Sequence, residues 1–383
     1  MGIYLDYNAT APINTEVIET MMHIYKDIIG NADSRTHDYG ENARQVVENA
    51  RKQVAELLGV HSDEIFFTSG ATESNNIALQ GLREYAESSN KKHIITTAIE
   101  HKAVLETAKH LASEGFEVDF IAPDESGRIN VDQVLKLIRD DTLLVSIMHV
   151  NNETGIIQPV NELGELLAEK KILFHIDATQ SCGKLVEEIQ KCKYNMLSFS
   201  AHKLQGPQGI GVLVLKKERY KLPPVKAVYY GGQQEKGIRP GTTPVALVAG
   251  LGKACEISLQ NYKKNNQKNK KIKDLILNEF AKSNLDFEVN GDQEHCINTT
   301  LNISIKGVVS EALMLSSKEF CGISNGSACT SKSYSLSYVL KAMGLPDERI
   351  ENSIRISWGP DLSEEEIKDN IDSLIEVASN IAG

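Results

Sequence analysis

Chemically versatile side chains recur directly after short apolar runs between residues 64 and 203. They supply a phosphate-type loop, an imidazole, amides, a carboxylate and an amine, at Thr72, His101, Asn152, Asp177, Gln180, Ser200, His202 and Lys203. Each has an ordinary explanation alone, because a carboxylate often caps a helix, and a histidine or lysine usually lies at the surface. Their shared position matters more, since ligands bind beyond the carboxyl ends of strands in open parallel sheets.

This set matches the needs of pyridoxal phosphate. The aldehyde of this cofactor requires a lysine amine, which Lys203 offers, and its pyridine nitrogen requires a carboxylate, which Asp177 offers. The phosphate favours backbone N–H groups at the start of a helix, and Gly70-Ala71-Thr72 opens a helical pattern. His101 offers a planar ring to face the cofactor. We therefore predict a pyridoxal-phosphate site.

The sequence lacks the motifs of a nicotinamide-binding site, of a phosphate-binding loop and of a zinc site. A nicotinamide enzyme would carry G-x-G-x-x-G after an early strand, whereas the run that ends at Thr68 is followed by SGATES. A phosphate-binding G-x-x-x-x-G-K-[ST] loop does not occur either. The six cysteines form no C-x-x-C pair, so we predict no metal site. Most of these thiols are expected to be reduced, small buried residues.

Length and charge narrow the class of protein. The 383 residues are 41% hydrophobic, which allows a large core and exceeds the usual size of one domain. The formal net charge of −11 argues against direct nucleic-acid binding, because phosphate recognition needs a basic face. No apolar run is long enough for a membrane span. We therefore expect a cytoplasmic enzyme of two domains that does not bind membranes.

Strand-like runs alternate with helix-like segments in the first two thirds of the chain. The runs lie at Glu64–Thr68, His93–Ala98, Leu143–Val150, Ile172–Ile176, Met196–Phe199 and Gly211–Leu215. This alternation predicts an α/β fold, with a mainly parallel mixed sheet flanked by helices. The versatile residues follow these runs, so we expect them at one edge of the sheet.

A second unit is expected after residue 258. A helix is predicted over Val245–Ser258, and the lysine-rich stretch Asn261–Lys273 is interpreted as its solvated continuation. Strand patterns recur at Thr300–Ile305 and Ser353–Ser357, with helices between and after them. We predict a large domain of residues 15–258 and a smaller α+β domain of residues 1–14 and 259–383.

A series of motifs along nearly the whole chain carries a resemblance to a known family. The motifs are YLDYNATAP (Tyr4–Pro12), FTSGATESNN (Phe67–Asn76), EHKAV (Glu100–Val104), HVNNETG (His149–Gly155), FHIDATQ (Phe174–Gln180), SAHKLQGPQGIG (Ser200–Gly211), RPGTTPV (Arg239–Val245) and SNGSACTS (Ser324–Ser331). With these motifs the sequence resembles cysteine desulfurases, fold-type I pyridoxal-phosphate enzymes, and its last motif is similar to the class I, NifS/IscS type. The resemblance implies a homodimer that binds pyridoxal 5′-phosphate and acts on L-cysteine.

The resemblance also implies roles around the cofactor ring. Lys203 would hold the cofactor and later move protons. Asp177 would pair with the pyridine nitrogen, and Gln180 would hydrogen-bond the ring hydroxyl. His101 would stack on the ring and act in acid–base steps, and Asn152 would lie near both ring and substrate.

The remaining implied roles concern the phosphate and the substrate. Phosphate contacts are implied for Ala71, Thr72, Ser200 and His202, with Thr242 of the partner subunit completing the site. Arg355, in SIRIS, would grip the substrate carboxylate through its planar fork.

Cys329 is the nucleophile that the resemblance implies. It would attack the substrate sulfur, keep it as a persulfide and leave alanine as the product. Small and polar residues surround it in Asn325–Lys332, so we expect an exposed, mobile loop. Attack requires thiolate, and a free cysteine has a pKa of about 8.5, so activation is expected. Cys321 lies in a more apolar run and is expected to be buried.

Other functions stay open at this point. A selenocysteine lyase or a cysteine C–S lyase would use the same scaffold. A non-catalytic protein that only binds partners is disfavoured, because Lys203, Asp177 and Cys329 are all present. The sulfur acceptor remains open among iron–sulfur scaffold proteins, tRNA-thiolation proteins and DNA-phosphorothioation systems, all reached through protein partners.

Two positions depart from the family pattern. Gln233 replaces a usual glycine in Gly231–Glu235, so we do not carry the family's loop shape over to this segment. Trp358, the only tryptophan, follows SIRIS where a smaller residue is usual. We expect this indole to affect access near Arg355.

Overall fold

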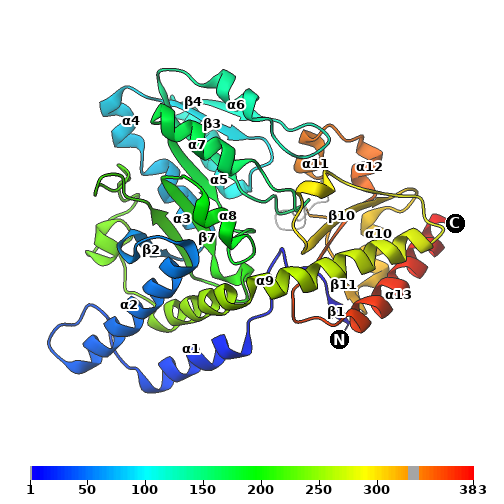
Figure 1. Ribbon diagram of the computed structural model, residues 1–383, viewed down its shortest axis with the longest axis horizontal. Helices are drawn as coiled ribbons and strands as arrows, with labels where there is room; N and C mark the ends of the chain where they lie inside the picture. The colour runs from blue at the N-terminus through cyan, green and yellow to red at the C-terminus, as the bar shows by residue number, and fades with distance from the viewer. Residues whose placement is uncertain (1, 327–335) are drawn as a thin grey trace.

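Two main sheets are joined by one long helix, and a two-stranded pair lies beside the smaller of them (Figure 1). The computed structural model describes residues 2–326 and 336–383. The larger sheet lies on one side and the smaller on the other, and α9 (Val245–Lys282) runs from the first to the second (Figure 1). In the described chain, no helix combines the length and the apolar character that a membrane span needs.

The large sheet has seven strands among the described residues, in the order β2-β8-β7-β6-β5-β3-β4. Strand β8 is antiparallel to both of its neighbours, and the remaining pairs are parallel. In chain order the strands are β2 (Ile65–Thr68), β3 (His93–Thr97), β4 (Glu117–Ile121), β5 (Thr142–Met148), β6 (Leu173–Asp177), β7 (Met196–Ser200) and β8 (Gly211–Leu215). The sheet is therefore mixed and mainly parallel, as predicted.

Helices cover both faces of this sheet because successive strand residues point to opposite sides. Phe66 faces a core formed with α3, α4 and α5. Its neighbours Ile65 and Phe67 face a second core formed with α1, α2, α6, α7, α8 and the start of α9. The covering helices are α1 (Thr15–Asp27), α2 (Asp38–Leu58), α3 (Ala71–Gln80), α4 (Arg83–Ser89), α5 (Lys102–Ser113), α6 (Val131–Leu137), α7 (Val160–Lys170) and α8 (Val186–Lys191).

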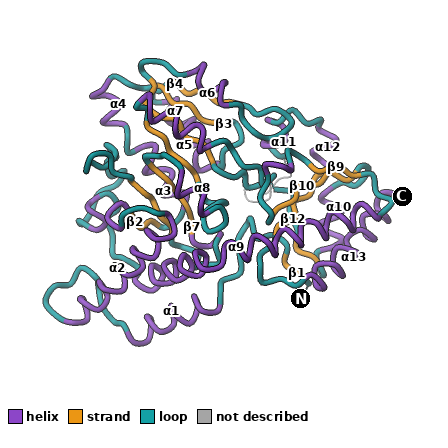
Figure 2. Tube along the Cα trace, viewed as in Figure 1, coloured by secondary structure: helices purple, strands orange, loops and turns teal. Residues whose placement is uncertain are grey.

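The small sheet is antiparallel, in the order β12-β10-β9 (Figure 2). Beside it β1 pairs in parallel with β11, so the start of the chain joins the C-terminal unit. The second half of α9, α10 and α13 form its apolar core. The elements are β1 (Ile3–Tyr4), β9 (Phe287–Val289), β10 (Thr300–Ile305), α10 (Ser310–Ser317), β11 (Cys321–Gly322), α11 (Tyr338–Ala342), α12 (Asp347–Glu351), β12 (Ser353–Ser357) and α13 (Glu364–Ala382).

The predicted strands of both sheets are confirmed, with ends that differ by one or two residues. The predicted helix over Val245–Ser258 does continue through the lysine-rich stretch, and it ends only at Lys282. Strands β1, β4, β9 and β11 were not predicted. Among the described residues β4 pairs with β3 alone, at the sheet edge, and Glu117 and Asp119 alternate with Val118 and Phe120, so it lacks an unbroken apolar run.

The division into residues 15–258 and residues 1–14 with 259–383 remains our proposal. Its boundary falls inside α9. In support of it, Val245–Cys255 contribute to the core of the large sheet, whereas Ile272, Ile276 and Phe280 contribute to the core of the small one.

Candidate functional site

A cavity of about 500 Å³ lies at the carboxyl ends of β5, β6 and β7. It also receives residues from the start of the chain and from β12. Most of the predicted site residues line it, namely Ala71, Thr72, His101, Asn152, Asp177, Gln180, Ser200, His202, Lys203 and Arg355. The prediction that the residues after the strands of the large sheet share one edge is therefore confirmed, and Arg355 reaches the same cavity from β12 of the small sheet.

Asp177 ends β6 and is almost fully buried. Its Oδ2 accepts a hydrogen bond from Nδ2 of Asn75 at 2.8 Å, and its Oδ1 accepts one from the N–H of Thr179 at 2.9 Å. These donors orient the carboxylate and stabilise its charge in a buried place. Such a carboxylate fits the protonated ring nitrogen of pyridoxal phosphate.

The side chain of Lys203 reaches the start of the chain. Its amine donates to the carbonyl oxygen of Asn8 at 2.5 Å and also to that of Ala9. Nε2 of Gln180 donates to the same Asn8 oxygen at 3.0 Å. Residues 8 and 9 therefore hold the amine and the amide together at the cavity wall.

His101 caps α5, where its Nδ1 accepts a hydrogen bond from the N–H of Ala103 at 3.1 Å. Desolvation lowers the pKa of its imidazole. The charge of Asp177 opposes this shift, and Lys203 adds to it. At neutral pH the ring is therefore neutral, with its proton on Nε2.

The start of α3 lies at the cavity. Gly70 precedes the helix, which has no side-chain cap, and both Ala71 and Thr72 line the cavity. The first N–H groups of a helix have no partner within it and suit an anion such as a phosphate. A side chain at Gly211 would meet Cα of Gly70 at 2.6 Å, so this pair of glycines brings the loop close to β8. Ser200 lies beside the same loop.

Arg355 on β12 is buried but incompletely partnered. Its Nη1 donates to the carbonyl of Asn152 at 2.9 Å, and its Nη2 donates to Oδ1 of Asp6 at 2.6 Å. Its Nε has no hydrogen-bond partner among the described residues. A buried guanidinium that keeps an open N–H beside a cavity fits a carboxylate ligand.

Three residues of the site were not singled out from the sequence. Asn8 and Asn75 contact Lys203 and Asp177 as described above. Glu100, beside His101, is fully buried, and its Oε1 accepts hydrogen bonds from Thr97 and from the N–H of Met148. Burial, helped by the charge of Asp177, raises its pKa to about 8. All three lie in motifs of the resemblance, which are the one signal that could have found them.

The other predicted site residues lie elsewhere. Thr242 is exposed just before α9 and does not line the cavity. Cys329 lies outside the described residues. Among the described cysteines all are buried, and burial raises the pKa of Cys321 to about 12, as its expected burial suggests. Trp358 is buried and does not line this cavity, so its expected effect on access near Arg355 is not seen.

A known protein family matches most of this chain. The family model named aminotransferase class-V matches residues 3–369. The chain belongs to the aminotransferase class-V family. Membership implies pyridoxal phosphate as the cofactor, which the donor set of the cavity fits.

Relatives within the family are similar over nearly the whole chain. Cysteine desulfurase IscS of Photorhabdus laumondii is 45% identical over 370 residues, covering 96% of this chain and 90% of that protein. A solved NifS-like protein is 35% identical with a TM-score of 0.91, covering 99% and 100%. SspA, solved in complex with cysteine, is 35% identical with a TM-score of 0.81, covering 93% and 99%. The chain therefore groups with the IscS-type members of the family.

Proposed function

We propose that this protein is a cysteine desulfurase, which takes sulfur from L-cysteine, releases L-alanine and holds the sulfur on Cys329 as a persulfide. The observation that carries the proposal is the convergence of Lys203, Asp177 and the open Nε of Arg355 on one cavity. These groups suit the cofactor aldehyde, the cofactor ring nitrogen and an amino-acid carboxylate. The cysteine complex of SspA supports the choice of substrate.

Holding the cofactor is the first task of these residues. We assign Lys203 to its aldehyde, Asp177 to its ring nitrogen, Gln180 to its ring hydroxyl and His101 to its face. The phosphate contacts are assigned to Ala71, Thr72, Ser200 and His202. When bound, pyridoxal phosphate supplies an electron sink that weakens the bonds around the substrate Cα.

Orientation of the substrate falls to Arg355. Asp6 and the carbonyl of Asn152 fix its guanidinium plane, which leaves Nε to bind the carboxylate. Lys203 and His101 are assigned to proton movement. Because the pKa of His101 is lowered, its Nε2–H is available as a neutral donor at pH 7.

Sulfur transfer is assigned to Cys329. Its thiolate attacks the substrate sulfur, an S–S bond forms, and the C–S bond breaks with its electron pair left on carbon. Protonation of that carbon yields alanine. The placement of the flanking residues supports this role, because Gly326 and Leu336, on either side of residues 327–335, both line the cavity.

Product analysis tests the proposal. Holoenzyme with L-cysteine and a thiol reductant is expected to form alanine and sulfide in equal amounts. Cys329→Ser is expected to lose at least about 100-fold of this turnover, because the nucleophile is gone. The matched control Cys321→Ser alters a buried thiol outside the cavity and should retain turnover. Pyruvate as the product would identify a C–S lyase and overturn the proposal.

The acceptor of the sulfur is proposed to be a protein. Candidates are an iron–sulfur scaffold, a tRNA-thiolation protein or a protein of DNA phosphorothioation. The net charge of −11 favours a basic docking surface on the acceptor and disfavours direct contact with nucleic acid. We place the enzyme in the cytoplasm, where reduced thiols and free cysteine are available.

A homodimer is the proposed assembly. Exposed apolar residues form a stripe on α1 and just after it, at Ile18, Met22, Tyr25 and Ile29. The spacing of Ile18, Met22 and Tyr25 places them on one side of α1, turned away from Val17 and Ile24, which are buried against the chain's own core, and Ile29 follows the end of the helix. A stripe of this kind suits burial against a second copy.

A further inference from the structure

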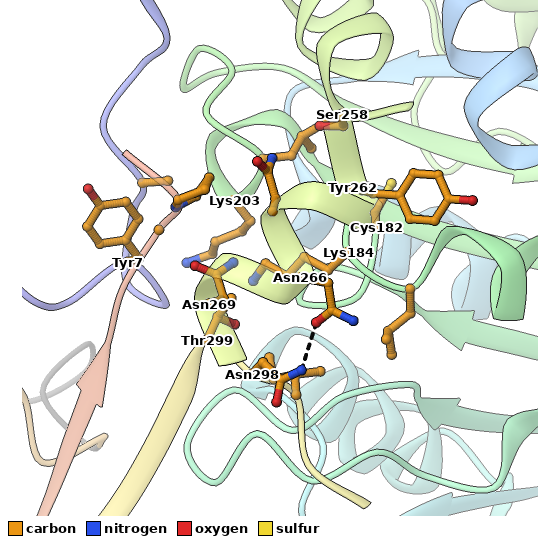
Figure 3. A pocket seen from close by; sticks show the side chains of 18 of the residues that line it. Tyr7, Cys182, Lys184, Lys203, Ser258, Tyr262, Asn266, Asn269, Asn298 and Thr299 are labelled. Carbon is orange, nitrogen blue, oxygen red and sulfur yellow. Dashed lines mark hydrogen bonds between the residues drawn. The ribbon is translucent and has the colours of Figure 1, made fainter. Parts of the chain in front are cut away.

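A second cavity lies behind Lys203, and we call it the rear cavity (Figure 3). It has a volume of about 250 Å³. One wall is a polar stripe on α9, whose members recur at helical spacing, at Ser258, Tyr262, Asn265, Asn266 and Asn269. The other walls come from residues 182–185, 296–299 and 358–360. The rear cavity therefore sits where the two sheets and the middle of α9 meet.

Three of the side chains that line the rear cavity carry a buried polar atom without a partner among the described residues. Oδ1 of Asn269, Oγ1 of Thr299 and Nε1 of Trp358 have no hydrogen-bond partner among the described residues. Their side chains come from three different segments and all line this cavity, with residue exposures of 5%, 5% and 1%. Leaving such a group unpaired costs about 1–3 kcal/mol each, so three at one cavity indicate a place for a polar ligand.

Charged groups of both signs line the same space. In Figure 3 the side chains of Lys184 and Lys203 extend toward Asn269. Burial, and then the charge of Lys203, lowers the pKa of Lys184 to about 8, so this amine is still mostly a cation at pH 7. Glu188 also lines the cavity and supplies a carboxylate. At the rim Asn298 donates to Asn266 at 2.8 Å.

We propose that the rear cavity binds a small free amino acid in its zwitterionic form. The carboxylate is received by Lys184 and the indole N–H of Trp358. The ammonium group is received by Oδ1 of Asn269 and the carboxylate of Glu188. Both a cationic donor and an anionic acceptor line one small space, which favours a zwitterion over a simple anion or a simple cation.

Calorimetric titration of holoenzyme with L-alanine tests this assignment. The Arg355→Gln substitution weakens binding of amino acids in the first cavity, which contains Arg355 and the proposed cofactor site. The visible absorption of the bound cofactor reports any ligand that still enters that cavity. We expect saturable alanine binding in this background. Propionate, which lacks the ammonium group, and ethylamine, which lacks the carboxylate, are expected to bind at least about tenfold more weakly.

Variants of the rear cavity make the test specific. In the same background, Lys184→Met and Asn269→Leu are each expected to weaken alanine binding by about tenfold, with cofactor absorption unchanged. Lys170→Met on the exposed surface of α7 is the matched control and should leave binding unchanged. Circular dichroism confirms that each variant is folded.

Three outcomes would overturn the proposal. One is alanine binding that both rear-cavity variants leave intact. Another is equal binding of alanine and propionate, or of alanine and ethylamine. The third is a crystal structure of the holoenzyme, grown with alanine, in which the rear cavity holds only water.

Discussion

Arg355 is held on two sides and left open on a third. Asp6 and the backbone of Asn152 hold its Nη atoms, so the guanidinium plane is set before substrate arrives. This preorganisation limits the entropy lost when a carboxylate binds. Asn75 acts in a comparable way on Asp177, since it orients the carboxylate that we assign to the cofactor ring.

Replacement of Arg355 by lysine tests the substrate role. Lysine keeps the charge but cannot reproduce the planar fork, so we expect kcat/KM for L-cysteine to fall by about 10- to 100-fold, mainly through KM. Steady-state kinetics measure this change. Arg349→Lys is the matched control, because Arg349 pairs with Glu288 and Asn290 away from the cavity. An unchanged KM for Arg355→Lys would remove this residue from substrate binding.

Glu100 predicts a pH dependence of stability. Its pKa is about 8 in the folded protein, against about 4.5 when it is exposed, so the folded state binds the extra proton between these values. Stability therefore falls as pH rises through this window, by up to about 1.4 kcal/mol per pH unit. Glu100→Gln removes the titrating group, and thermal melts from pH 5.5 to 8 should show a flatter profile for this variant.

An exposed glutamate on the neighbouring helix provides the control for this measurement. Glu106→Gln on α5 changes the same functional group where it pairs with Lys109 at the surface. The stability of the Glu106→Gln variant should change with pH in the same way as that of the parent protein. If Glu100→Gln and the parent lost stability in parallel, Glu100 would not be the group that titrates.

At the scale of elements, the loop after residue 230 is tied to the large sheet by Glu235. This carboxylate accepts hydrogen bonds from Nη1 and Nη2 of Arg51, at 2.9 and 2.8 Å, and from the N–H of Phe67 at 2.9 Å. Gln233, which stands where the family usually has glycine, has a φ of −96°. Any L-residue adopts this value, so the substitution strains nothing there.

Removal of Glu235 should destabilise the protein strongly. Glu235→Ala removes the carboxylate from a largely buried guanidinium, which keeps its contacts with Glu48 and the carbonyl of Ile65, and from the N–H of Phe67. The free energy of unfolding should therefore fall by about 2–3 kcal/mol. Denaturant unfolding measures this loss. The matched control is Glu114→Ala, which breaks the exposed pair with Arg83 and should cost at most about 1 kcal/mol. Similar losses in the two variants would mean that the Glu235 contacts contribute no more to stability than an exposed ion pair does.

At the scale of the whole molecule, the homodimer that we propose concerns Thr242 and the apolar stripe on α1. Thr242 is exposed and lies outside its own chain's cavity. If it completes the phosphate site of a partner subunit, each active site of the dimer draws residues from both chains. Such sharing gives a test that does not depend on a structure of the dimer.

Mixed dimers test the sharing of residues. Lys203→Ala and Thr242→Asp are expected to be inactive and strongly impaired, respectively, as separate proteins. Mixing and reassembly at equal amounts should recover about a quarter of the parent activity, because half of the dimers are mixed and each has one intact site. No recovery, with mixed dimers shown to form, would place Thr242 outside the partner's site.

Much of the fold could be predicted because its signals are local. The apolar runs that become β3, β5, β6, β7 and β8 are short and bounded, and the buried strands of a parallel sheet leave such runs. The edge strand β4 was missed because Glu117 and Asp119 interrupt its apolar residues. The cavity residues follow from the rule for strand ends, which needs only the order of elements.

The sequence by itself determined the chemical groups of the site and their placement at one edge of the sheet, because strand ends and motif residues are properties of consecutive residues. Tertiary structure decided which distant residues complete that site. Asn75 reaches Asp177 across 102 positions of the chain, and Asn8 reaches Lys203 across 195. The rear cavity likewise exists only where α9, the approach to β10 and the end of β12 meet. Local sequence patterns do not reveal such contacts, because packing between separate elements creates them.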